Sequence, residues 1–329
     1  MDISYGISRR AFLTTLTAAA KPRMEGLEDL ARNLGGRGAV LLDGRTMHTW
    51  GDQAEVSDWL SSAKPVLSTL LFFALAERKI KSIDALVADQ GWPLVEKDRT
   101  MTLRHLANMT SAYARPDLPG AAWAYNDFGI NLYQKTLFDR IFRQDPEEAA
   151  NKRFSPLGLQ DGLKFRATNR RMSASVRDFA RIAQFWLARG KWQGKQILPR
   201  QFFSDYCRPQ TPVDLPHTEK AETNDYLKLG SYGGGSDHFT DYGAGIYGCN
   251  WWFNGKGRLH PNAITWPDAP RDTFMSIGAG GNCAVMIPSQ KAILLAARAN
   301  WGKHTPGDSA APTNQHIKLL IEALGKGKR

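Results

Sequence analysis

The segment Ser61-Ser62-Ala63-Lys64 places a serine hydroxyl three residues before a lysine amine, and it is the only Ser-x-x-Lys in the chain. Residues three apart on a helix project from the same face, so the amine can reach the hydroxyl. A serine hydroxyl becomes a strong nucleophile when a neighbour accepts its proton, and burial lowers the pKa of a lysine enough for it to help. The pattern predicts acyl transfer through Ser61. The alternative is a serine that caps a helix and is followed by a lysine on the surface, which would have the same sequence pattern.

The following residues predict the helix that positions this pair. Pro65 suits the first turn of a helix, and Val66 to Arg78 carries leucines and alanines at helical spacing. Ser61 therefore lies just before or at a helix amino terminus. The free amides and partial positive charge of such a terminus favour an oxyanion in the transition state.

The order of elements along the chain predicts an α+β fold. Gly38 to Leu42 and Thr46 to Trp50 are typical of two strands around an Asp-Gly turn, and residues 103–210 are largely helical in pattern. Two further strands, Cys283 to Ile287 and Ala292 to Ala299, precede a last helix. We expect one sheet-containing domain built from residues 24–102 and 211–329, with a mainly helical domain of residues 103–210 inserted.

Three segments occur in a fixed order with the Ser-x-x-Lys pattern: Tyr125-Asn126-Asp127 with the residues up to Leu132, Met172 to Arg181, and Gly194 to Pro199. Together they resemble the β-lactamase-related serine hydrolases, which include class C β-lactamases, D-alanyl-D-alanine carboxypeptidases and family VIII carboxylesterases. The resemblance extends from about Gly38 to Trp301. It implies a β-lactamase/DD-peptidase-like fold, with an antiparallel sheet flanked by helices and an inserted helical domain.

The resemblance also implies roles for individual residues. Tyr125 matches the tyrosine of the family's Tyr-x-Asn motif, which makes it a candidate proton relay between Ser61, Lys64 and the leaving group; the alternative is a core tyrosine beside Trp123. Asp127 is a candidate substrate-binding residue, at the position where the family usually has asparagine; a carboxylate accepts hydrogen bonds but cannot donate as an amide does.

The family's third motif, Lys-Thr-Gly or His-x-Gly, should fall at Gly278-Ala279-Gly280-Gly281, which contains no basic residue. The corresponding strand supplies a backbone amide to the oxyanion hole in the family, which small residues can still do. We expect Gly280, Gly281 and Asn282 to border the substrate, with the Gly281 or Asn282 amide beside the Ser61 amide as oxyanion donor.

Without a cation to bind a carboxylate, the resemblance favours a small uncharged ester or amide substrate and an esterase-like activity that needs no cofactor. A β-lactamase or D,D-peptidase is the alternative, with Arg298 as the nearest candidate cation. A catalytically silent relative that binds a ligand is a third interpretation. The aromatics Trp251, Trp252 and Trp266 suit either an acyl pocket or the core.

Composition narrows the remaining function classes. The net charge is +11, but the basic residues are scattered and form no nucleic-acid recognition pattern. The seven histidines and three cysteines show no metal-ligand spacing, and no segment is apolar enough to cross a membrane. Residues 1–20, with Arg9-Arg10 and a short apolar run, are a candidate twin-arginine signal for export to the periplasm or medium; the alternative is a frayed helix in a cytoplasmic protein.

Overall fold

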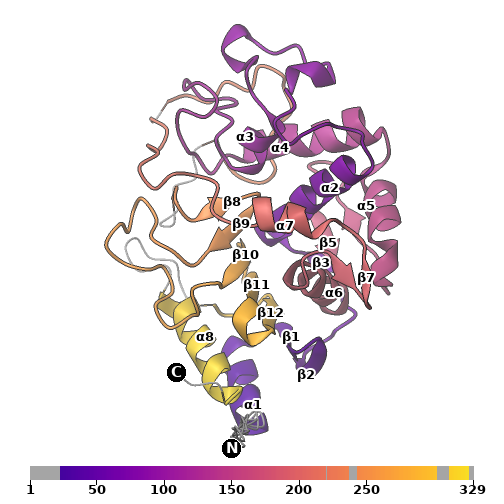
Figure 1. Ribbon diagram of the computed structural model, residues 1–329, viewed down its shortest axis with the longest axis vertical. Coiled ribbons are helices and arrows are strands. Elements are labelled where there is room, and N and C mark those ends of the chain that lie inside the picture. Colours follow the sequence, from indigo (N-terminus) through magenta and orange to yellow (C-terminus); the bar gives the residue numbers. More distant parts are fainter. Residues whose placement is uncertain (1–22, 220, 237–242, 302–310, 326–329) are drawn as a thin grey trace, which may run out of the picture.

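The computed structural model describes residues 23–219, 221–236, 243–301 and 311–325 (Figure 1). The candidate export signal, residues 1–20, lies outside the described residues. The described part of the chain holds no helix that is both long and apolar enough to cross a membrane.

An antiparallel sheet forms the centre of the fold. Among the described residues it has seven strands in the order β2-β1-β12-β11-β10-β9-β8. The strands are β1 (Arg37–Leu42), β2 (Arg45–Trp50), β8 (Tyr247–Gly248), β9 (Trp251–Phe253), β10 (Phe274–Gly278), β11 (Asn282–Ile287) and β12 (Ala292–Ala297). Because β1 pairs with β12, both ends of the chain build one sheet, as predicted.

Short strands make two smaller sheets. A three-stranded sheet has the order β3-β5-β4, and a hairpin joins β6 to β7. Their bounds are β3 (Ser57–Asp58), β4 (Lys164–Phe165), β5 (Met172–Ala174), β6 (Lys191–Trp192) and β7 (Lys195–Gln196). The pairing of β3 with β5 fastens the residues just before Ser61 to a segment more than 110 residues later.

The helices include a short 3-10 turn directly in front of the first long buried helix. The α-helices are α1 (Met24–Leu34), α2 (Lys64–Ala76), α3 (Leu103–Ala107), α4 (Asp127–Lys135), α5 (Pro146–Phe154), α6 (Val176–Leu187), α7 (Arg200–Tyr206) and α8 (Ala311–Ala323). The shorter turns are η1 (Leu60–Ala63), η2 (Ala88–Gln90), η3 (Glu96–Asp98), the π-helical η4 (Thr136–Phe142), η5 (Ser155–Leu157) and η6 (Pro288–Gln290).

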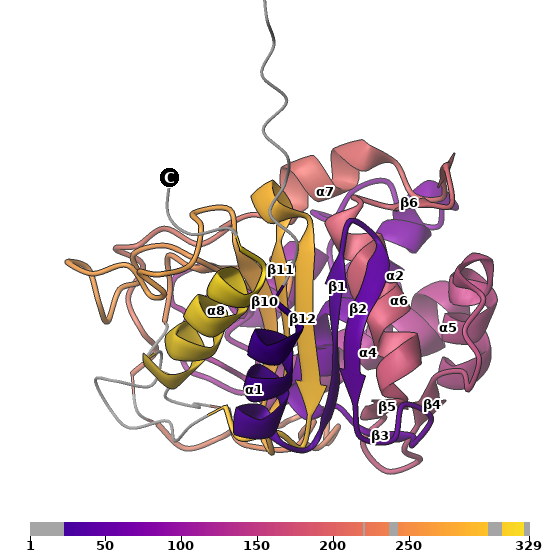
Figure 2. The same ribbon diagram turned by 90° about the horizontal axis from the view of Figure 1, so that it is seen from below.

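Helices cover both faces of the sheet, which is why every residue of β11 and β12 is buried. Figure 2 shows α1 and α8 together on one face, and α6 on the other, where it contacts β1, β11 and β12. The amphipathic pattern of α6 fits this position, because its apolar side packs on the sheet and Ser175 caps its first turn.

The predicted α+β fold with an antiparallel sheet is confirmed, as are the first hairpin and the two late strands. Several elements were not predicted individually, among them α1 and β10. Within residues 103–210, which were predicted to be largely helical, α4 continues directly into the π-helical η4. The division into a sheet domain and an inserted helical domain stays a prediction; α6 belongs to the expected insertion and covers the sheet.

Candidate active site

Ser61 lies in η1, which leads directly into α2. Ser61 is partly exposed, whereas the neighbouring Ser62 is buried. Trp59, just before the turn, holds it to the rest of the fold: its indole Nε1 donates to Ala174 O at 2.9 Å, and its ring stacks on Phe179 at 3.9 Å between centroids. The nucleophile candidate therefore lies on a buried and well-connected base, while Ser61 itself stays partly exposed.

Lys64 is the first residue of α2, and its amine contacts three oxygen atoms. It donates a 2.9 Å hydrogen bond to Ser61 Oγ and another of 2.9 Å to Tyr125 OH. Its third partner is Asp127 Oδ1, at 2.7 Å. Lys64 is fully buried, and an ammonium group has three donors, so these contacts use all of them. The structure thus brings together four residues that the sequence singled out.

Burial lowers the pKa of Lys64 from its usual value, because removing the ammonium from water disfavours the charged form. The Asp127 carboxylate opposes this effect, through its charge and its hydrogen bond. Two opposing influences on one amine are what a proton-transfer group requires, since both protonation states must be accessible.

Tyr125 is buried, and it belongs to an aromatic cluster as well as to the Lys64 contact. Its ring stacks on Trp252, with centroids 5.8 Å apart, and lies 6.3 Å from Trp123. Burial raises its pKa, the Asp127 charge adds to the rise, and a hydrogen bond with Ser61 opposes it. The phenol is therefore protonated at rest and touches both the nucleophile and the amine.

Asp127 is placed by the start of α4. Asn126 caps this helix, because its side-chain oxygen accepts from Phe128 N and Gly129 N at 3.0 Å each. The first turn of a helix stabilises a carboxylate such as that of Asp127. The Asp127 backbone is fixed by Gly235 O and by the N–H of Tyr232, at 3.0 and 2.9 Å.

The end of β10 borders the nucleophile turn. A Cβ on Gly278 would lie 2.6 Å from Ser62 N and 3.1 Å from Ser61 N, so only glycine permits this approach. Ser276, two residues earlier on β10, has its hydroxyl 2.8 Å from Ser62 Oγ. Gly278 is thus the residue of the third-motif segment that lies against the Ser61 amide.

The other predicted residues of this segment lie in the turn after β10 and at the start of β11. Gly280 and Gly281 both have positive φ, and a Cβ on Gly281 would collide with Ala299 O. Asn282 is buried, donates to Ala279 O at 2.8 Å and accepts from Arg298 N–H at 3.2 Å. These contacts brace the turn. The expected roles of Gly280, Gly281 and Asn282 toward an oxyanion stay predictions.

The alternative cation Arg298 follows β12, and its guanidinium pairs with Glu55 at 3.1 Å. Trp251 and Trp266 are fully buried; Trp251 packs against Trp186 and Phe72 in the core. Of the three tryptophans considered for an acyl pocket, Trp252 is the one that contacts Tyr125.

Two residues of the site's surroundings were missed by sequence reasoning. Tyr232 is buried, with its ring 4.9 Å from Lys64 Nζ and its hydroxyl donating to Leu60 O at 3.0 Å. Asp58 accepts from Leu60 N–H at 2.8 Å and pairs with Arg171 at 2.8 Å. The only sequence signal for Tyr232 was an aromatic residue within a glycine-rich run.

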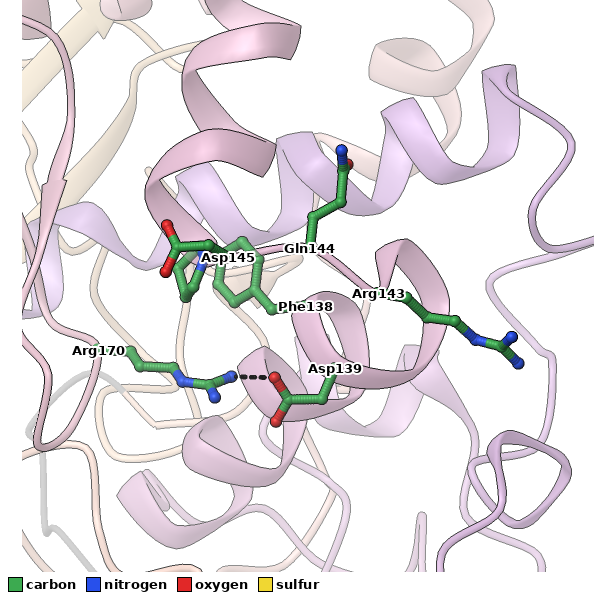
Figure 3. A pocket seen from close by; sticks show the side chains of 7 residues that line it. Phe138, Asp139, Arg143, Gln144, Asp145 and Arg170 are labelled. Carbon is green, nitrogen blue, oxygen red and sulfur yellow. Dashed lines mark hydrogen bonds and ion pairs between the residues drawn. The ribbon is translucent and has the colours of Figure 1, made fainter.

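Figure 3 shows a hollow beside η4 and the start of α5. It is lined by Phe138, Asp139, Arg143, Gln144, Asp145, Pro146 and Arg170. Its Arg170 and Asp139 already pair with each other at 2.8 Å, which fastens the turn before β5 to η4. The hollow shares no lining residue with the Ser61 cluster.

Comparison with solved structures identifies proteins that share the fold. A putative β-lactamase from Bacteroides dorei matches with a TM-score of 0.65 and 14% identity, covering 92% of this chain and 97% of its own. A β-lactamase from Mycobacterium bovis matches at 0.62 and 18%, covering 91% and 99%. A putative 6-aminohexanoate-dimer hydrolase from Bacillus anthracis matches at 0.63 and 16%, covering 92% and 83%. A search of curated proteins found no match.

The sequence itself matches the family model described as Beta-lactamase over residues 25–293. This range includes η1, α2, the start of α4 and β10, the elements that surround Ser61. Family membership is consistent with a serine hydrolase. On this match the chain belongs to the Beta-lactamase family.

Proposed function

We propose that the chain is an esterase-like serine hydrolase that forms an acyl-enzyme on Ser61 from a small uncharged ester or amide. The observation that carries this proposal is the contact between a partly exposed serine and a fully buried lysine, with 2.9 Å from Ser61 Oγ to Lys64 Nζ. A buried amine at hydrogen-bond distance is the arrangement that activates a hydroxyl nucleophile.

The reaction begins when Ser61 Oγ attacks the substrate carbonyl carbon. The hydroxyl proton passes to Lys64, because burial lowers the pKa of this amine. The Tyr125 phenol bridges the amine and the leaving group. The leaving alcohol or amine takes a proton from this pair. Backbone amides, with Ser61 N–H among them, stabilise the tetrahedral oxyanion. Water then attacks the acyl-enzyme and gives a proton to the same groups, which protonate Ser61 Oγ as the acyl group departs as the acid.

The preference for an uncharged substrate rests on the charges around Ser61. The described segment from Phe274 to Asn282 carries no basic residue. The Lys64 ammonium is matched by Asp127 at 2.7 Å, so this pair presents no net positive charge to a substrate carboxylate. A β-lactam or a peptide carboxyl terminus would therefore find no counter-ion among these residues.

Hydrolysis of p-nitrophenyl butyrate by the wild-type protein and its Ser61→Ala variant tests the proposal. We expect turnover to vanish in Ser61→Ala and to persist in Ser62→Ala, a matched variant of the adjacent serine. Ester turnover that survives in Ser61→Ala, or absence of turnover in the folded wild type, would refute it.

Nitrocefin assayed alongside separates the proposal from its main alternative. The β-lactamase and D,D-peptidase activities remain the second candidate, because two of the three structures named above carry the name β-lactamase. Nitrocefin turnover faster than ester turnover would favour this candidate. Loss of both activities in a folded protein would favour a silent ligand-binding relative.

We also propose that residues 1–20 direct export through the twin-arginine route to the periplasm or medium. Arg9 and Arg10 precede a short uncharged run that ends in three alanines. A reporter fused to the first thirty or so residues should be translocated, and replacing both arginines by lysine should abolish this. Translocation unaffected by that replacement would contradict the twin-arginine route.

A further inference from the structure

The residue before the nucleophile adopts an unusual backbone conformation. Leu60 has φ +50°, in the left-handed region that bulky L-residues rarely occupy. Such a conformation persists only where the surroundings hold it, and it is enriched at functional sites. Two side chains hold Leu60: Asp58 Oδ1 accepts its N–H at 2.8 Å, and Tyr232 OH donates to its carbonyl oxygen at 3.0 Å.

These two contacts act on different peptide planes. The Leu60 N–H belongs to the plane that precedes Leu60, whereas the Leu60 carbonyl shares a plane with the N–H of Ser61. Because a trans peptide is planar, its C=O and N–H point in opposite directions. The Tyr232 hydroxyl therefore sets the direction of the Ser61 N–H, although it does not touch Ser61.

The Ser61 N–H takes no part in the hydrogen bonds that build η1. The first helical hydrogen bond of η1 runs from Ser62 N–H to Trp59 O at 3.1 Å, so the amide of Ser61 precedes the helical ladder and has no partner within it. The end of β10 at Gly278 lies beside the same nitrogen. An amide in this position stabilises an oxyanion only if its direction is fixed before the reaction.

We propose that Tyr232 is a positioning residue that aims the Ser61 amide at the oxyanion by holding the Leu60–Ser61 peptide plane. This inference rests on the proposed hydrolase function. A donor on the carbonyl also polarises the peptide and strengthens its N–H as a donor.

The surroundings of Tyr232 suit such a role. Its side chain is buried, its own N–H donates to Asp127 O at 2.9 Å, and its carbonyl accepts from Asn169 Nδ2 at 2.8 Å. Burial and the nearby Asp58 and Asp127 carboxylates keep the pKa of the phenol well above its usual value, with Arg171 opposing. The hydroxyl is therefore a proton donor throughout the working pH range, and its ring is fixed beside Lys64 Nζ.

Tyr232→Phe isolates the hydroxyl, since the ring next to Lys64 remains. Tyr226→Phe is the matched control: it lies six residues earlier on the same connection, and its hydroxyl donates to the buried Asp98 at 2.7 Å. We would measure kcat and KM for p-nitrophenyl butyrate, the inhibition constant of phenylboronic acid, whose serine adduct imitates the tetrahedral intermediate, and hydrogen exchange of the Leu60–Ala63 peptide.

In Tyr232→Phe we expect kcat to fall about ten-fold, the size of one neutral hydrogen bond, and the boronate inhibition constant to rise by a similar factor. KM and the pH profile should stay unchanged, while exchange of the Leu60–Ala63 amides becomes faster. Tyr226→Phe should keep kcat, KM and the boronate constant at the wild-type values even if its melting temperature falls.

Equal kinetics in the two variants, or a rise in KM at constant kcat, would overturn the inference. If the wild type hydrolyses no ester and binds no boronate, the proposed function fails separately. In that case hydrogen exchange alone tests whether Tyr232 fixes the Leu60–Ser61 peptide plane. Faster exchange only in Tyr232→Phe would support this, and equal exchange in both variants would overturn it.

Discussion

The two sides of the Ser61 site differ in their chemistry. On the side of α2 and α4, Lys64, Tyr125 and Asp127 are buried and connected by hydrogen bonds of 2.7–2.9 Å. On the side of β10, the segment from Gly278 to Gly281 offers only backbone and a methyl group. In the proposed mechanism the first side moves protons, whereas the second shapes the space for the substrate and supplies backbone amides.

This difference indicates that the reaction centre and the substrate anchor are separable. Proton transfer needs side chains with adjustable pKa values at fixed distances. Binding a substrate carboxylate needs a cation in addition, and β10 contributes none. Under the proposed function, the protein would combine a serine nucleophile with a strand that selects substrates by their shape and not by their charge.

The largest expected effect comes from breaking the proton-transfer side. Tyr125→Phe should lower kcat by about 10²-fold, because the phenol that bridges Lys64 and the leaving group is lost. Tyr247→Phe is the control, since Tyr247 is equally buried in the same cluster and its hydroxyl contacts Asn250 at 3.2 Å. Similar losses of kcat in both variants would show that the cluster, not proton transfer by Tyr125, matters.

A smaller effect is expected from disturbing the β10 side. Gly278→Ala should lower kcat roughly 10-fold, because the added methyl group would lie 2.6 Å from Ser62 N and must displace η1. The control is Gly255→Ala, whose added methyl meets only Ile246 Cγ2 at 3.3 Å. Steady-state kinetics with melting curves check this; unchanged kcat in Gly278→Ala would contradict the close contact.

Two esters that differ in charge test the lack of a substrate-binding cation on the β10 side. Mono-p-nitrophenyl succinate carries a carboxylate where p-nitrophenyl butyrate ends in a methyl group. We expect kcat/KM for the anionic ester to be lower by about five-fold at 0.15 M salt, where long-range attraction to the +11 net charge is screened. Preference for the succinate would reveal a cation that serves the site.

The smallest expected effect is a shift in pH dependence. Lys64 must lose a proton to act as base, so the acid limb of kcat/KM follows its pKa. Asp127 raises that pKa against the larger effect of burial, and Ser61, Tyr125 and Tyr232 contribute neutral groups around the amine. Asp127→Asn should therefore move the acid limb to lower pH.

Asp84→Asn is the control for the pH profile, because Asp84 pairs with Arg104 in a half-exposed position away from Ser61. Its profile should match the wild type. An acid limb that moves to higher pH in Asp127→Asn would contradict the assignment of Lys64 as the base.

The sequence predicted those parts of the site that depend on local spacing. Ser61 and Lys64 meet because they are three residues apart at the start of a helix. Tyr125 was found through its place in a family motif, and the structure brings it to the same amine. The antiparallel sheet also followed from the resemblance, and its late strands from their apolar runs.

Contacts between distant segments could not be predicted in this way. Tyr232 reaches Leu60 across 172 positions from an irregular glycine-rich connection, where no periodicity exists to mark a buried side. β10 was overlooked because its five residues include Ser276 and end at Gly278, so they lack the apolar density of β11. The importance of Gly278 lies in the atoms of η1 that a methyl group at this position would contact, and the sequence alone does not show these contacts.

The pairing of β1 with β12 has a consequence for the timing of folding. Leu42 lies opposite Ala292 in the sheet, so the strand preceding the nucleophile turn remains without its inner neighbour until most of the chain has been made. At translation rates of 5–20 residues per second, this wait lasts on the order of tens of seconds. For most of that interval β10 has not been made either, so the nascent chain lacks the strand end that borders Ser61 in the folded protein.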